Sequence, residues 1–190
     1  MPRKKTQHYV DNKEFYKAIV GHRKLTNRAK REKIEPPIIS NYIGECLLKI
    51  ANHLSYSPNF INYTFRDEMV ADGIENCLLY FSNFNPRKSK NPFTYFTTIM
   101  WYAFIRRINR EQKNQYIKYK MFSAKISTSD IHNELANEDS GENNVLQNLA
   151  VYDNINEFIA NFERKQNAKK KQIKRKKRKN LEKFYEKNTK

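Results

Sequence analysis

The chain has 190 residues, room for one modest domain with additional segments, and its 37 Lys and Arg against 20 Asp and Glu give a formal net charge of +17. A positive excess of this size favours a polyanionic partner, nucleic acid above all, and says little about the fold. No apolar run approaches the roughly 18 residues of a membrane-spanning helix, so we expect no membrane partner. An aromatic content of 13% excludes a wholly disordered chain.

Scarce glycine and long stretches without proline predict an all-α fold. Residues 1–36 are interpreted as a helical leader, with a helix from about Asp11 to Lys33 that Pro36 and Pro37 follow. Ser40 suits the N-cap of a second helix, which opens the main domain, residues 37–122. The apolar stripe of that helix consists of Ile43, Leu47, Ile50 and Leu54.

The third predicted helix, from about Thr64 to Phe84, has two chemically different faces. Its apolar face comprises Met69, Val70, Ile74, Cys77, Leu78 and Phe81. The opposite side is acidic, which is unusual in a basic chain, and consists of Asp67, Glu68, Asp72, Glu75 and Asn76. A Mg²⁺-dependent nuclease site is one interpretation, but carboxylates at helical spacing more often form a solvent-exposed face.

Asn91 and Pro92 predict the start of a fourth helix, which continues to about Lys120. On a helical wheel its core stripe contains Phe93, Met100, Phe104 and Ile108. A second arc contains Tyr95, Phe96, Ile99, Tyr102, Arg106 and Arg110. Aromatic residues outside the core stripe indicate either a second packing surface or a binding platform.

Three further segments complete the chain: an acidic polar linker at residues 123–144, a helix at residues 145–163, and a flexible basic tail at residues 164–190. Residues 164–179 hold eleven basic residues in sixteen and no acid. Cys46 and Cys77, each in an apolar helical pattern, are predicted to be buried free thiols in a reducing cytoplasm.

No catalytic motif accompanies these elements. The four histidines are far apart in the sequence, and no CxxC, HExxH, GxSxG or glycine-rich phosphate loop occurs. We therefore expect a protein without enzymatic activity, metal or cofactor.

Two stretches, EMVADGIENCLLYFSNFN at residues 68–85 and NPFTYFTTIMWYAFIRRINR at residues 91–110, resemble region 2 of bacterial sigma factors. The layout is most similar to the late-transcription sigma factors of large tailed (T-even-like) bacteriophages. Phe93-Thr94-Tyr95-Phe96 stands where the family has its FSTY tetrad, and Gly73 and Phe84 keep the family's spacing. The resemblance covers about a third of the chain closely, and it departs at the tandem tryptophan positions, which Ile99 and Met100 occupy.

The resemblance implies a compact helical sigma region 2-like domain that binds RNA polymerase core, through the β′ coiled coil and with the β flap as a further candidate contact. The implied polymerase-binding residues are Asp67, Glu68, Asp72, Glu75 and Asn76. The residues implied to bind and melt an A·T-rich minus-ten element of promoter DNA are Tyr95, Phe96, Trp101, Tyr102, Arg106, Arg107, Arg110 and Lys113. Leu181, Phe184 and Tyr185 resemble the peptide by which the phage proteins engage the DNA sliding clamp.

Late transcription in the cytoplasm of an infected bacterial host, helped by a late co-activator, is the setting that the resemblance implies. A different class also fits the composition: a basic RNA- or ribosome-binding structural protein anchored by residues 164–179.

Overall fold

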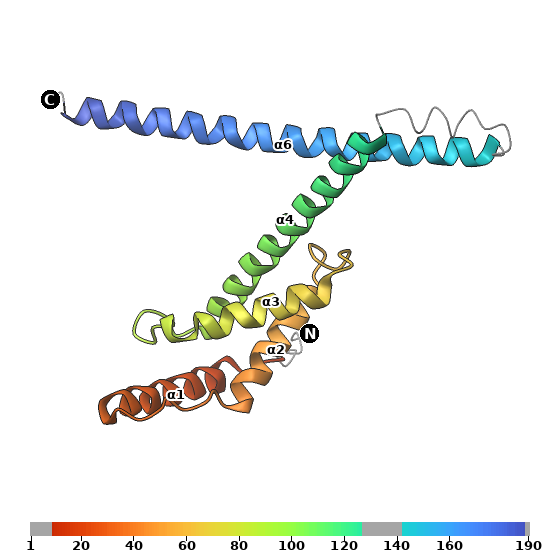
Figure 1. The fold of residues 1–190 in the computed structure, drawn as a ribbon. Helices are drawn as coiled ribbons and strands as arrows, with labels where there is room; N and C mark the ends of the chain where they lie inside the picture. Colours follow the sequence, from red (N-terminus) through yellow and green to blue (C-terminus); the bar gives the residue numbers. More distant parts are fainter. Residues whose placement is uncertain (1–8, 127–141, 189–190) are drawn as a thin grey trace, which may run out of the picture. The chain divides into compact units, whose positions relative to one another are not determined.

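The computed structural model describes residues 9–126 and 142–188 (Figure 1). Within these ranges the secondary structure is helical and contains no strand, so the predicted all-α fold class is confirmed. The elements are α1 (Asn12–Glu32), α2 (Asn41–Ser55), α3 (Arg66–Leu79), the short 3-10 helix η1 (Phe81–Asn83), α4 (Pro92–Ile126) and α6 (Glu142–Asn188).

Local capping explains where two of these helices begin. The Asp11 carboxylate accepts hydrogen bonds from the backbone N–H groups of Lys13 at 2.7 Å and Glu14 at 3.2 Å, which satisfies two donors of the first turn of α1. Asn91 Oδ1 accepts from the Thr94 backbone N–H at 3.1 Å and caps α4 in the same way, with Pro92 at the first helical position. Both starts agree with the sequence prediction.

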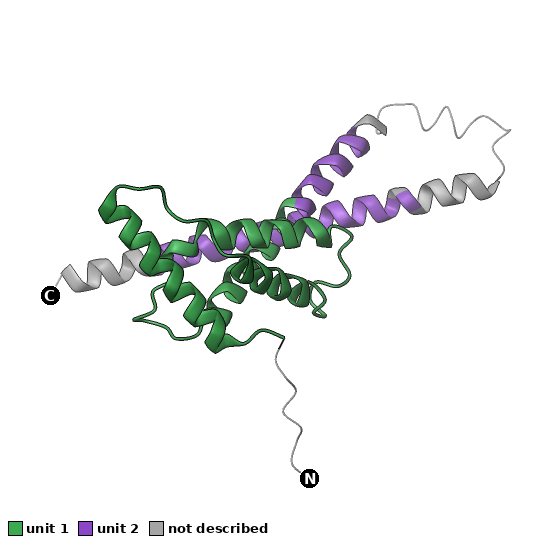
Figure 2. Ribbon diagram, turned by 90° about the horizontal axis from the view of Figure 1, so that it is seen from below, with its two compact units in different colours: residues 1–110 green, residues 111–190 purple. Residues whose placement is uncertain are grey.

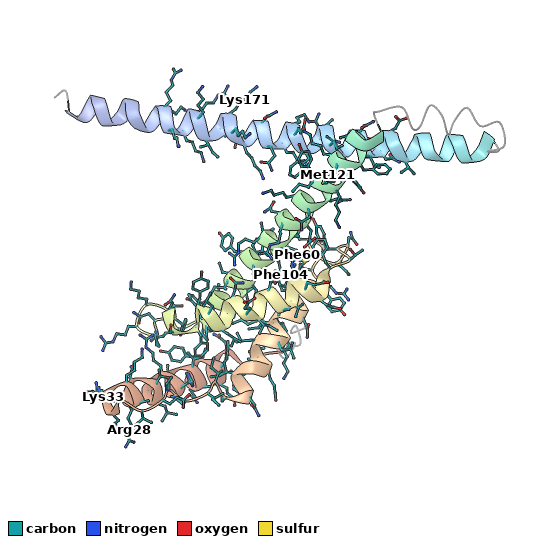
Figure 3. The ribbon with its side chains drawn as sticks, in the orientation of Figure 1. Arg28, Lys33, Phe60, Phe104, Met121 and Lys171 are labelled. Carbon is teal, nitrogen blue, oxygen red and sulfur yellow. The ribbon has the colours of Figure 1, made fainter. Side chains whose placement is uncertain are left out.

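The chain forms two compact units, residues 1–110 and residues 111–190 (Figure 2), and helix α4 contributes to both. In the first unit, α1, α2, α3 and the first part of α4 enclose an aromatic-rich core. Its fully buried side chains include Phe15, Leu47, Phe60, Phe96 and Phe104. Figure 3 shows two of these rings, Phe60 and Phe104, side by side in the first unit, with ring centroids 5.1 Å apart.

The two cysteines belong to this core. Cys46 and Cys77 are buried free thiols, as predicted. Burial raises the pKa of Cys77 to about 12, because a thiolate would lose its hydration there.

In the second unit the end of α4 pairs with α6 through rings and one ionic cluster. The Tyr116 ring stacks on Phe162 with centroids 4.5 Å apart, and Tyr119 meets Phe158 edge-on at 5.3 Å. Glu163 Oε1 accepts from the Tyr116 hydroxyl and from Lys120 Nζ, each at 2.7 Å. We call Tyr116, Lys120, Phe162 and Glu163 the α4–α6 lock.

Helix α6 is much longer than predicted. We expected a helix at residues 145–163 and a flexible tail at residues 164–190, but the helix runs from Glu142 to Asn188. No Gly or Pro occurs in this range, and Lys, Arg, Gln and Glu are good helix formers. The predicted linker also shrinks, because α4 continues to Ile126; residues 127–141 lie outside the described part of the chain.

Candidate functional site

The outward side of α3 combines carboxylates with exposed leucines. Six of its side chains share one arc of about 120° on the helical wheel. These residues, the α3 face, are Asp67, Glu68, Ala71, Glu75, Leu78 and Leu79, all exposed. Leu78 is 46% exposed and Leu79 is 70% exposed, so Leu78 does not belong to the apolar core face to which we assigned it. Such a surface suits a protein partner with basic and apolar side chains.

Two of the predicted polymerase contacts turn toward α4 instead. The Asp72 carboxylate forms a two-pronged ion pair with Arg107: Nε lies 2.9 Å from Oδ2, and Nη2 donates to Oδ1 at 3.1 Å. Both side chains are only about one-fifth exposed, at 21% and 19%. Asn76 Oδ1 accepts from Arg106 Nη2 at 2.6 Å. Asp72, Asn76 and Arg107 therefore join α3 to α4, and the roles of Asp72 toward polymerase and of Arg107 toward DNA phosphate stay predictions.

Phe96 requires the largest correction. It was the predicted base-stacking aromatic, but its side chain is 0% exposed. Its ring packs against Phe15 of α1 at 5.8 Å, Phe81 at 5.7 Å and Phe84 at 6.1 Å. Stacking on a base would require the ring to leave the core, which costs about 3–5 kcal/mol and exceeds the roughly 1–3 kcal/mol that one stacking interaction returns. Phe96 is a core residue.

Two more predicted DNA contacts are mainly packing residues. Tyr95 is half-buried, meets Phe84 edge-on at 5.2 Å, and donates its hydroxyl to the Tyr80 carbonyl at 3.5 Å. Trp101 is also half-buried and meets the buried Phe60 edge-on at 4.8 Å. Packing within the first unit is thus the contact that the structure shows for both rings.

Among the predicted DNA contacts on α4 in the first unit, one aromatic side chain and two arginines are exposed. Tyr102 is 60% exposed, and Arg106 and Arg110 follow it at successive four-residue steps on the same side of the helix. We call these three residues the α4 stripe. Lys113 is exposed as well, on the part of α4 that belongs to the second unit. Among the predicted DNA-binding aromatic residues, Tyr102 is therefore exposed, whereas Phe96 is not.

Two other expectations concern the chain ends and metal ions. Leu181, Phe184 and Tyr185 lie in α6, but their side chains lie outside the described residues, so the clamp-binding assignment stays a prediction. Across the described ranges, no three His, Cys, Asp or Glu side chains gather where they could hold a metal ion. None of the helices there combines the length and apolarity required to cross a membrane.

Comparison with models of protein families found no match to this chain, and comparison with curated proteins found none either.

Proposed function

We propose that this chain is a sigma-type transcription initiation factor, which docks on RNA polymerase core through the α3 face and captures unpaired promoter bases with the α4 stripe. The proposal rests on the resemblance of residues 68–110 to sigma region 2. The structural observation that supports it most is that the acidic α3 face and the α4 stripe, with its tyrosine and two arginines, are separate exposed surfaces on α3 and α4.

The electrostatics of the α3 face favour a protein partner over DNA. Asp67, Glu68 and Glu75 would repel phosphates, whereas they attract a basic protein surface such as the proposed polymerase coiled coil. Leu78 and Leu79 add apolar area that becomes buried when a helix packs against them.

The α4 stripe has the chemistry for a single-stranded segment. The Tyr102 ring stacks on an unpaired base, an interaction of about 1–3 kcal/mol that offsets the cost of unpairing. Arg106 and Arg110 neutralise phosphates beside it. The hydrogen bond from Arg106 to Asn76 orients the guanidinium, so the side chain loses less freedom on binding.

Polymerase docking is tested by charge reversal on the α3 face. We expect the double variant Glu68→Lys with Glu75→Lys to lose binding to core polymerase in a pull-down, because both carboxylates are exposed and neither is paired with Arg106 or Arg107. The matched control is Glu45→Lys on α2, which is also exposed and should bind normally. Equal binding by the double variant would refute the docking surface. Asp72→Lys is unsuitable, because it breaks the ion pair with Arg107.

Promoter opening is tested at Tyr102 with purified core polymerase and permanganate footprinting of a promoter. Tyr102→Ala should reduce open complexes by roughly tenfold or more, in line with the loss of one base stack of about 1–3 kcal/mol. Tyr102→Phe keeps the ring and should retain most of the activity. If both variants open promoters normally, Tyr102 has no part in melting.

The sliding-clamp contact of Leu181, Phe184 and Tyr185, the late co-activator and the infected bacterial cytoplasm belong to the proposal as consequences of the resemblance. Replacing the three residues by Ala should abolish clamp-dependent activation and preserve basal initiation.

The second candidate, a basic RNA- or ribosome-binding structural protein, is favoured by the exposed cations of residues 164–179. It predicts no effect of the Glu68 and Glu75 reversals on any partner.

A further inference from the structure

The cationic part of α6 is a continuous helical segment. The proposed function gives this segment no role. We call residues 164–179 the basic segment. All sixteen of its residues are exposed, and eleven of them are Lys or Arg (Lys171 is labelled in Figure 3). No Asp or Glu lies within it.

The cations surround the helix instead of following one side. At about 100° per residue, the eleven positions leave no angular gap wider than roughly a quarter of a turn. The segment therefore has no apolar face: Ile173 is its one large aliphatic residue, and it is 55% exposed. This pattern does not suit an amphipathic helix in a membrane interface or against another helix, since both require an apolar side.

Like charges repel along this helix. Lys165 and Lys169, Lys170 and Lys174, and Lys171 and Arg175 are each four residues apart, which places them on neighbouring turns. The repulsion opposes the helical state of an isolated segment, whereas a polyanion removes it and adds the entropy of released counterions. The helical form of the basic segment is thus the form that a polyanion stabilises.

The geometry selects one polyanion. A sixteen-residue helix is about 24 Å long. The major groove of B-form DNA is about 12 Å wide, accepts an α helix, and has phosphates along both walls, so a helix with cations in every direction meets phosphates on two of its sides. The major groove of A-form RNA is too deep and narrow for a helix to enter.

We propose that the basic segment of α6 is a sequence-nonspecific binding site for B-form duplex DNA, in which the helix lies in the major groove between the two phosphate backbones. This site goes beyond the proposed function, because it requires neither polymerase nor a promoter sequence and it engages paired instead of melted DNA.

The experiment measures binding of the full chain to a non-promoter DNA duplex at several salt concentrations. The test variant replaces Lys169, Lys170, Lys174, Lys176 and Lys177 by Gln, and the control replaces five exposed lysines of the first unit, Lys13, Lys17, Lys24, Lys30 and Lys49. We expect the test variant to lose at least tenfold in affinity, and the slope of log K against log salt to become shallower by roughly 4 to 5, because each phosphate contact contributes about 0.9. The control should change neither quantity.

Circular dichroism separates loss of binding from loss of folding. Gln has nearly the helix propensity of Lys, so without DNA the test variant should be at least as helical as the unmodified chain. The unmodified chain should gain helix when DNA is added at low salt. An unchanged salt slope in the test variant would overturn the proposal, as would equal or tighter binding to A-form duplex RNA or to anionic lipid vesicles. Polymerase pull-down by the same variant should be normal, so failure here is distinguishable from failure of the proposed function.

Discussion

Gly73 lies where α3 packs against the ring of Phe104. A Cβ atom added at this position would stand 2.9 Å from Phe104 Cε1 and 3.5 Å from Met100 Cγ. Both neighbours are fully buried, so the ring cannot swing into solvent to make room. We therefore expect Gly73→Ala to destabilise the first unit by about 1–3 kcal/mol, as overpacked cores do. Chemical denaturation followed by tryptophan fluorescence measures this change.

Gly44 supplies the matched control for Gly73. It lies in α2, is exposed, and would bring its new Cβ within 4 Å of nothing. Gly44→Ala should accordingly stabilise the chain by roughly 0.5–1 kcal/mol, the usual gain from replacing an unconstrained helical glycine. The same substitution thus has opposite signs at two helical positions. Two changes of the same sign would contradict the packing of α3 on Phe104.

At the scale of an element, the α4–α6 lock connects helix pairing to pH. Its hydrogen bonds from Lys120 and Tyr116 lower the pKa of Glu163, and Glu163 in turn raises the pKa of Lys120. The Glu163 carboxylate contributes fully to the pairing of α4 with α6 above the ordinary Glu pKa, and this contribution is lost as the pH falls through the lowered pKa of Glu163. The Lys120 ammonium group contributes fully below the ordinary Lys pKa, and its contribution is lost as the pH rises through the raised pKa of Lys120. Pairing should therefore be strongest between about pH 5 and pH 10.

The loss of pairing at low pH is the part of this prediction that is easier to measure. Nuclear Overhauser contacts between the Tyr116 and Phe162 rings should weaken as the pH is lowered from about 6 to about 3, through the ordinary Glu pKa and below it. Glu163→Gln cannot ionise, so its contacts should be independent of pH in this range. A pH response that is identical in the two proteins would assign the effect to other groups.

The elements themselves were largely predictable, because caps and apolar periodicity are local properties. Asp11, Asn91 and Pro92 begin helices where they were expected to. The end of α6 was missed for a related reason: no apolar period continues beyond Phe162, and a highly charged run without periodicity is typical of an unfolded tail.

The site was only partly predictable, because the helical wheel describes one helix and not its neighbours. The wheel of α4 separates Phe96 from the stripe of Met100 and Phe104, but it cannot show that Phe15 of α1 packs against Phe96. Contacts from a second helix make Phe96 a core residue, although it lies on the arc that looked like a binding platform. The same limit applies to Asp72 and Arg107, whose pairing depends on how α3 meets α4. Tyr102, Glu68 and Glu75 are exposed, because none of them takes part in the Phe15–Phe96 contact or in the Asp72–Arg107 ion pair.

At the scale of the whole molecule, the two units differ in how much apolar surface they bury. The continuous core lies within residues 10–108 and contains several fully buried phenylalanines. Among the second-unit residues whose side chains are described, only Ile155 is buried. Since apolar burial is the dominant favourable term in folding, the first unit should be considerably more stable than the second.

Unequal stability predicts unfolding in two steps. Trp101, the single tryptophan of the chain, packs on Phe60 and so reports only on the first unit, whereas far-ultraviolet circular dichroism reports on the helices of both units. Heating should reduce the dichroism before the tryptophan fluorescence changes, because α6 and the end of α4 melt first. Phe162→Ala, which removes a stacked ring from the α4–α6 lock, should lower the midpoint of the first step and leave the fluorescence midpoint in place. If the two signals instead follow one curve, and Phe162→Ala shifts both, the units fold as one cooperative body.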